Sequence, residues 1–151
     1  MEDLHEFYEG YIAAFNARNA DAFAACFHPP VTMLSGRGAF RPDESPCTVV
    51  DDPGRFPGQM PAHWSHSSID AVTALDDVAP FTTAAGLPEP RGRRKGLVTS
   101  VSRWDHEGTC YEQVQALYLL SERDGRWGIT VVADLGFTRR RGRERASPER
   151  G

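Results

Sequence analysis

Hydrophobic and polar positions follow a helical period near the N-terminus of the chain. Between residues 4 and 17, apolar side chains recur three, four, seven, eight and eleven positions after the first, which is the pattern of one broad helical face. Asp3, followed by Glu6, supplies a start signal similar to a capping box. The sequence therefore predicts a helix over residues 4–17 whose apolar face comprises Leu4, Phe7, Tyr8, Tyr11, Ile12 and Phe15.

A second, shorter helix is predicted directly after the first. Asn19 suits its N-cap, and the pair Pro29 and Pro30 ends it because proline cannot donate the helical hydrogen bond. Residues 31–34 then have the composition of a short strand. The apolar side of this helix comprises Phe23, Cys26 and Phe27.

The middle of the chain has a different character. Prolines and glycines recur between residues 35 and 67, so we expect a long irregular segment there, with one short strand at residues 47–50. A third helix is predicted from Ser67 or Ser68 up to Pro80, because apolar residues then recur every three positions. They are Ile69, Val72, Leu75 and Val78. A second loop is expected over residues 81–95.

Three runs rich in β-branched and aromatic residues follow, at residues 97–104, 110–120 and 127–133. The short polar segments DHEG and ERDG separate them, which predicts a three-stranded antiparallel meander. Helices that precede consecutive strands indicate an α+β fold, with the apolar face of the first helix packed on the sheet. We expect a single domain over residues 1–138.

Composition narrows the class of protein. The 151 residues are 40% apolar and 25% charged, which is typical of a globular domain, and no apolar run approaches the roughly 20 residues of a membrane span. The N-terminal segment lacks the pattern of a secretory signal, so we expect a cytoplasmic protein without membrane contact. Cys26, Cys47 and Cys110 are too widely spaced for a zinc motif or a disulfide framework, which indicates reduced thiols.

The charge is unevenly distributed. Residues 139–151 contain six Arg and two Glu and have a charge of +4. Because the whole chain has a net charge of −4, residues 1–138 have a net charge of −8. The acidic body excludes nucleic acid as the expected partner. The basic tail could contact phosphates, but its lack of apolar residues favours a disordered, solubilising segment.

Two strings resemble a known family. YIAAFNARNADAFAACFHPPVTMLSG and YLLSERDGRWGITVV, in this order of elements, resemble the SnoaL-like branch of the nuclear-transport-factor-2-like superfamily. The resemblance covers roughly residues 4–36 and 96–137. It implies helices packed on a strongly curved antiparallel sheet, forming a cystatin-like cone with a ligand pocket, and a homodimer formed through the sheet. Isomerases, cyclases and dehydratases share this fold with proteins that only bind ligands, so the fold does not specify the chemistry.

The ketosteroid-isomerase branch of that superfamily offers a residue-level comparison. It uses a helix-1 tyrosine, an acid on a late strand and a carboxylate base after the first strand. Tyr11 falls at the tyrosine position, whereas the base and acid positions fall at or near Ser35 and Leu117, which cannot perform those roles. A steroid-isomerase function is therefore disfavoured, and Tyr11 is either a hydrogen-bond donor or a core aromatic residue.

Other residues could carry chemistry. His63 and His66 flank Trp64 and could share a metal, face a pocket mouth as a base, or be ordinary loop residues; no motif supplies a third ligand, so we expect no metal. Asp134 follows an apolar strand, where a carboxylate in a cleft could act as an acid or base, although a solvated strand end fits equally well.

Strand alternation separates Tyr111, Gln113, Gln115 and Leu117 from Glu112, Val114, Ala116 and Tyr118. Because two glutamines on one face would be unusual in a dry core, Gln113 and Gln115 either line a wet pocket or meet solvent or a dimer partner. Tyr8, Trp64 and His66 complete the predicted ligand contacts.

Two hypotheses follow. The first is a cofactor-independent isomerase, cyclase or dehydratase acting on a small apolar carbonyl compound, with Asp134 or His63 as proton carrier and Tyr11 as donor. The second is a non-catalytic binding or dimeric scaffold module of the same fold, favoured by the missing acid and base positions. The sequence does not decide between them.

Overall fold

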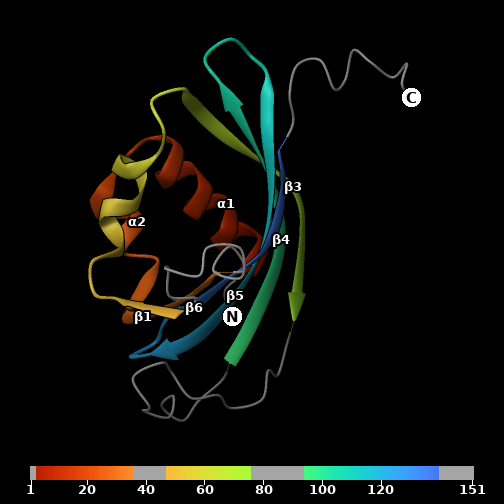
Figure 1. Ribbon diagram of the computed structural model, residues 1–151. Coiled ribbons are helices and arrows are strands. Elements are labelled where there is room, and N and C mark those ends of the chain that lie inside the picture. The colour runs from red at the N-terminus through yellow and green to blue at the C-terminus, as the bar shows by residue number, and fades with distance from the viewer. Residues whose placement is uncertain (1–2, 36–46, 76–93, 140–151) are drawn as a thin grey trace.

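A computed structural model describes residues 3–35, 47–75 and 94–139, in which two α-helices, a short 3-10 helix and six strands follow one another (Figure 1). The first half contains α1 (Leu4–Asn16), α2 (Ala20–Ala24), β1 (Phe27–Ser35), β2 (Cys47–Val50) and η2 (Pro53–Gln59). The second half contains β3 (Trp64–Leu75), β4 (Arg94–Asp105), β5 (Cys110–Arg123) and β6 (Arg126–Arg139). Of the predicted tail, residues 139–151, Arg139 is the last residue of β6, and the other residues lie outside the described ranges.

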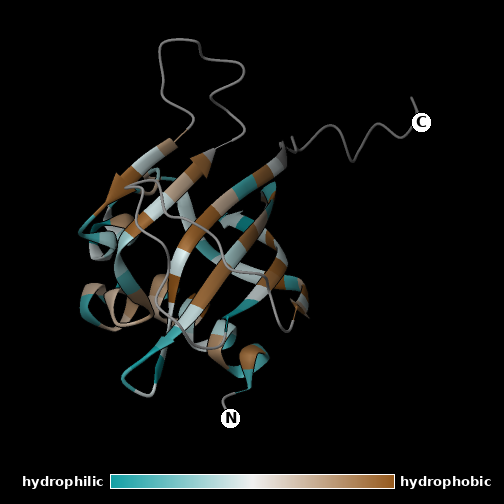
Figure 2. Cartoon of the chain, turned by 90° about the horizontal axis from the view of Figure 1, so that it is seen from below, coloured by the Kyte–Doolittle hydropathy of each residue, from teal (hydrophilic) through white to brown (hydrophobic). Residues whose placement is uncertain are grey.

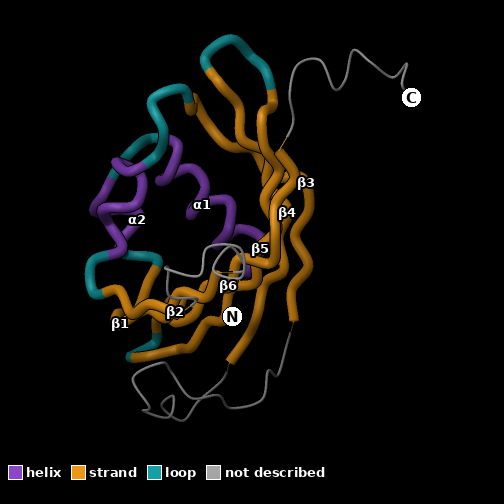
Figure 3. The backbone as a smooth tube through the Cα atoms, viewed as in Figure 1, coloured by secondary structure: helices purple, strands orange, loops and turns teal. Residues whose placement is uncertain are grey.

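The strands form one sheet in the order β2-β1-β6-β5-β4-β3. All neighbours pair antiparallel except β1 and β6, which run parallel. The register shifts at bulges in four of these pairings, and bulges bend a strand and increase its twist. The sheet therefore curves around the helices, as Figure 3 shows, and the predicted α+β fold with a curved sheet is confirmed.

Helix α1 begins where the sequence predicts. The Asp3 carboxylate accepts a hydrogen bond from the His5 backbone nitrogen. The helix lies against the concave side of the sheet (Figure 1). Beyond the helix, Arg18 adopts a left-handed conformation with φ 55°, and Asn19 caps α2 by accepting from the Ala22 nitrogen. The buried residues of α1 are Leu4, Tyr8, Tyr11, Ile12 and Ala14.

Strands β4, β5 and β6 form the predicted meander, and each is longer than the sequence indicated. The β5–β6 turn places Asp124 and Gly125 at φ 54° and 77°, as a tight two-residue hairpin turn requires. Hydrophobic and hydrophilic positions alternate along the strands (Figure 2), so that each strand presents one face to α1 and the other away from it. We call these the inner and outer faces of the sheet.

The predicted third helix is wrong, because residues 64–75 form strand β3. The pairing of β3 with β4 shifts between Ile69 and Ala71, which leaves Asp70 as an extra residue in a bulge. Ile69 and Val72 consequently both pack against the core although they are three positions apart. The bulge thus imitates the spacing of a helix, while the β-branched residues fit a strand. The predicted strand at residues 47–50 is confirmed as β2.

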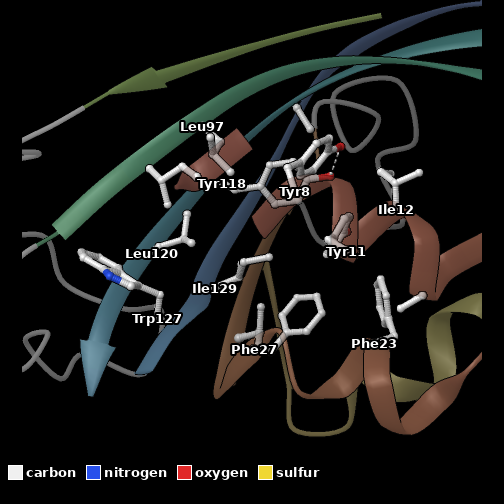
Figure 4. Packing of buried hydrophobic residues seen from close by; sticks show 14 of the residues in the cluster. Tyr8, Tyr11, Ile12, Phe23, Phe27, Leu97, Tyr118, Leu120, Trp127 and Ile129 are labelled. Atoms are coloured by element: carbon white, nitrogen blue, oxygen red, sulfur yellow. Dashed lines mark hydrogen bonds between the residues drawn. The ribbon is translucent and has the colours of Figure 1, made fainter. Parts of the chain in front are cut away.

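The core lies between α1, α2 and the inner face (Figure 4). Aromatic rings from the two helices and from β1 and β5 meet there with centroids 4.9–6.0 Å apart, as for Tyr11 with Phe23 and Phe27. The segment η2 packs against α2, where a Cβ on Gly54 would lie 3.0 Å from the Ala20 carbonyl oxygen. No helix among the described residues is long and apolar enough to cross a membrane.

Candidate functional site

Two hollows lie between the helices and the inner face of the sheet. The larger, which we call the chamber, has a volume of about 310 Å³, and the smaller, the recess, about 60 Å³. Both are lined by Tyr11, Phe15, Arg103, Val114, Ala116 and Tyr118, so they adjoin. The chamber is further lined by Phe23, Met33, Phe56, Gln59, Met60, Val132 and Asp134, and the recess by Tyr8, Ile12, Ser67, Thr99 and Val101.

Three tyrosines meet beside the recess. The Tyr8 hydroxyl lies 3.1 Å from Thr99 Oγ1 and 3.2 Å from the Tyr118 hydroxyl (Figure 4), and the Tyr11 ring meets the Tyr118 ring edge-on with centroids 5.3 Å apart. The rings of Tyr8 and Tyr11 stack with centroids 5.1 Å apart. Helix α1 therefore contributes two hydroxyls one turn apart, and β5 contributes the third.

Burial raises the pKa of Tyr8, Tyr11 and Tyr118 far above the ordinary value, and coulombic repulsion from a neighbouring tyrosinate raises each of them further. The Arg103 charge acts in the opposite direction on the same three pKa values, but more weakly. The hydroxyls thus stay neutral at physiological pH and serve as hydrogen-bond donors rather than as bases.

This cluster predicts a specific alkaline titration. Unfolded tyrosines ionise near pH 10, so the native protein, whose pKa values are raised, binds more protons above that pH than the unfolded chain. We expect at least three of the four tyrosines to remain un-ionised at about pH 11, in ultraviolet difference spectra, until the protein unfolds. Stability should be unaffected by these groups below pH 10 and should fall above it. Smooth ionisation of all four tyrosines in folded protein would contradict the burial of the cluster.

An ion pair that the sequence analysis missed lies at the junction of the two hollows. Arg103 Nη1 donates to Glu112 Oε1 over 2.9 Å, with side chains 24% and 6% exposed. A signal for it existed, because alternation places Arg103 on the same face of β4 as Leu97 and Glu112 on the same face of β5 as Tyr118. These charged residues at strand ends were not distinguished from solvated ones.

Asp134 is oriented by a local irregularity of β6. The pairing of β5 with β6 shifts between Ala116, opposite Asp134, and Gln115, opposite Gly136, which leaves Leu135 in a bulge. The Gly136 nitrogen donates to Asp134 Oδ1 over 3.2 Å, and Gly136 has a φ of 141°. The half-buried carboxylate lines the chamber. Bulges of this kind commonly orient side chains next to functional sites.

The structure brings some predicted site residues together. Tyr11 and Asp134 both line the chamber, and Tyr8 lines the recess. Trp64 is not among the lining residues; its ring packs on Phe15 at 5.1 Å and under Arg18 at 4.2 Å, and its Nε1 donates to Ser67 Oγ. The predicted ligand contact of Trp64 stays a prediction.

His63 and His66 lie at the start of β3, outside the lining of either hollow. The His63 ring meets Tyr111 edge-on at 4.5 Å, and the His66 ring stacks on Trp104 at 6.1 Å. Within the described ranges, no three His, Cys, Asp or Glu side chains are grouped to hold a metal ion.

Gln113 and Gln115 lie on the outer face, because Glu112, Val114 and Tyr118 occupy the inner one. The Gln113 Nε2 donates weakly to Asp70 Oδ2 over 3.4 Å, and Asp70 also accepts from Ser102 Oγ over 2.7 Å. The two glutamines were expected either to line a wet pocket or to meet solvent or a dimer partner, and the structure places them on the face away from the pocket.

Comparison with known proteins identifies the fold. No protein-family profile matches the chain, and no curated protein matches it. Among solved structures, a candidate scytalone dehydratase from Novosphingobium aromaticivorans is similar, with a TM-score of 0.61 and 10% identity over 91% of this chain and 85% of that one. A cystatin-like protein of unknown function from Nostoc punctiforme has a TM-score of 0.58 and 5% identity over 87% and 86%.

The association domain of CaMKII from C. elegans is also similar, with a TM-score of 0.54 and 12% identity over 87% of this chain and 92% of that one. Together these structures confirm the predicted cystatin-like α+β fold. Identities this low concern the fold alone.

Proposed function

We propose that the protein binds a small, largely apolar carbonyl compound in the chamber and, without a cofactor, moves a proton on it, as an isomerase, cyclase or dehydratase does. One observation carries this proposal: Asp134 and Tyr11 both line a single pocket whose walls are mainly apolar. Few polar groups converging in an apolar hollow of about this size are typical of small-molecule sites.

The chemistry assigns one role to each group. The Asp134 carboxylate would accept a proton from the carbon next to the carbonyl; the C–H electron pair forms the enolate, and the oxygen becomes negative. A neutral tyrosine hydroxyl would donate a hydrogen bond to that oxygen. Because the pKa of Tyr11 is raised by burial, its proton stays in place throughout the reaction. When the substrate has a β,γ carbon–carbon double bond, the enolate is a dienolate, and return of the proton from Asp134 to the γ-carbon shifts the double bond into conjugation and completes an isomerisation.

Binding in the chamber is tested by filling it. Ala116 is buried on β5 and lines both hollows, so Ala116→Phe places a ring where the ligand would lie. We expect Ala116→Phe to weaken the binding of 2-tetralone, a small bicyclic ketone, at least tenfold in titration calorimetry, while thermal unfolding shows that the variant is folded.

Ala13→Phe is the matched control, because Ala13 lies on the exposed side of α1. This variant should bind 2-tetralone as the wild type does. Equal affinity of the Ala116→Phe variant and the wild type would place the ligand elsewhere and contradict the proposal.

A second candidate, a homodimeric module, is favoured by the outer face. All four large hydrophobic side chains that are exposed in the described residues occupy it, as the strand pairing shows: Leu34, Val49, Leu75 and Leu135, the last 54% exposed. Exposed apolar patches mark interaction sites. The similarity to an association domain is compatible with a second copy as the partner.

Light scattering after size exclusion checks the dimer. We expect a dimer for the wild type and a monomer for Leu135→Lys, because a charge would be buried in the interface. Ala13→Lys, on the opposite side of the molecule, should remain dimeric. A wild type that is monomeric at all concentrations would contradict the homodimer and leave the pocket proposal unaffected.

A further inference from the structure

The position of Arg103 suggests which chemical group a ligand presents to the protein. Arg103 is on the inner face of β4 and lines both the recess and the chamber. A guanidinium has five N–H donors in a rigid fork that matches the two oxygens of a carboxylate. One of these donors, on Nη1, is used by the hydrogen bond to Glu112 Oε1.

Charge supports an anionic group at this point. The Arg103 charge opposes, without outweighing, the rise in pKa that burial causes in Tyr8, Tyr11 and Tyr118, as expected for a positive charge close to these three tyrosines. An anion there would face the guanidinium, whereas the Tyr8 hydroxyl already donates to Thr99 Oγ1. Charge-assisted hydrogen bonds of this kind are about twice as strong as those between neutral groups.

The sizes of the hollows fit the two parts of such a ligand. The recess of about 60 Å³ has the volume of about two water molecules, which matches the two oxygens of one carboxylate. The chamber of about 310 Å³ corresponds to about ten water molecules. Its aromatic wall favours a flat, apolar body and comprises Tyr11, Phe15, Phe23, Phe56 and Tyr118.

The strand order also determines how such a ligand would be oriented. Arg103 is on β4 and Asp134 on β6, with Val114 and Ala116 of β5 between them. A ligand carboxylate is attracted by Arg103 and repelled by the Asp134 carboxylate, so its acidic end is directed to the recess and its body to Asp134.

We propose that the ligand is a small aromatic carboxylic acid whose carboxylate binds Arg103 at the recess and whose ring occupies the chamber beside Asp134. This specificity rests on the proposed function, because it concerns the same pocket. It narrows the expected carbonyl compound to one that also carries an acid group.

The test compares cinnamate with cinnamamide, a neutral analogue of the same shape, by titration calorimetry at neutral pH. We expect the wild type to bind cinnamate at least tenfold more tightly than cinnamamide. In Arg103→Gln/Glu112→Gln, both partners become neutral amides, so no unpaired charge remains buried. This double variant should lose the preference for the acid and keep its affinity for the amide.

Arg55→Gln controls for the loss of a positive charge, because Arg55 is exposed and lines neither hollow; it should retain the preference. Equal binding of the two probes by the wild type, or a preference that survives in the double variant, would overturn the role of Arg103. If 2-tetralone binds and cinnamate does not, only the acid specificity fails. If none of the three probes binds, the pocket proposal fails as well.

Discussion

Replacing Asp134 with asparagine is expected to slow the exchange of the α-protons of 2-tetralone for deuterium by at least about 100-fold. The amide has the shape of the carboxylate but cannot accept the proton at neutral pH. The backbone at position 134 should keep its geometry in this variant, because the asparagine side-chain oxygen can accept a hydrogen bond from the Gly136 nitrogen as Asp134 Oδ1 does. Proton nuclear magnetic resonance in D2O measures the exchange directly and needs no knowledge of the natural substrate.

Asp70→Asn is the matched control, because Asp70 is a carboxylate on the outer face, bonded to Ser102 and away from both hollows. The Asp70→Asn variant should catalyse the exchange of the α-protons of 2-tetralone at the wild-type rate. Exchange that is unchanged in Asp134→Asn, or a wild type that binds 2-tetralone without any exchange, would contradict the catalytic role and favour a protein that only binds.

Tyr11→Phe separates the two interpretations of Tyr11, since normal exchange in that variant would make Tyr11 a core residue.

Replacing Trp64 with alanine is expected to lower the free energy of unfolding by about 3–5 kcal/mol, the usual cost of truncating a buried large aromatic residue. Trp64 is 2% exposed and joins β3 to α1 and to the turn that follows α1: it packs on Phe15 of α1, lies under Arg18 and donates to Ser67 of its own strand. Urea unfolding followed by circular dichroism measures the change.

Trp104→Ala is its control, because the Trp104 indole also donates to a serine, Ser68 Oγ, but is only half-buried. We expect a clearly smaller loss of stability in that variant. Trp64→Ala should also retain the affinity for 2-tetralone under conditions in which it is folded. A large loss of affinity with little loss of stability would instead support the ligand contact that the sequence suggested for Trp64.

Much of the fold could be predicted because the signals are local. Helix α1 has a cap, a start signal and a continuous apolar face, and β5 is a run rich in β-branched and aromatic residues between two turn sequences. Residues 64–75 were misassigned for a physical reason: the bulge at Asp70 changes the spacing of inward residues from two to three. A bulge depends on how β3 pairs with β4, and the sequence of β3 alone does not contain this information.

The candidate site was predictable only in part. Tyr11 was found because the helical pattern places it on the buried face, and Asp134 because it follows an apolar strand. Arg103 was missed because its ion pair joins two strands across a hairpin, and a charged residue at a strand end is more often solvated. Which face of β5 meets the helices was likewise undecided, since both faces contain polar and apolar residues.

The sequence by itself determined the type of most elements, the α+β class and the helical tyrosines, because hydrophobic period, caps and turn residues act over a few neighbouring positions. The tertiary structure alone decided the parallel pairing of β1 with β6, the two hollows and the meeting of Arg103, Asp134 and the tyrosine hydroxyls in them. These features depend on the curvature of the sheet and on contacts between residues far apart in the chain, where the sequence carries no periodic signal.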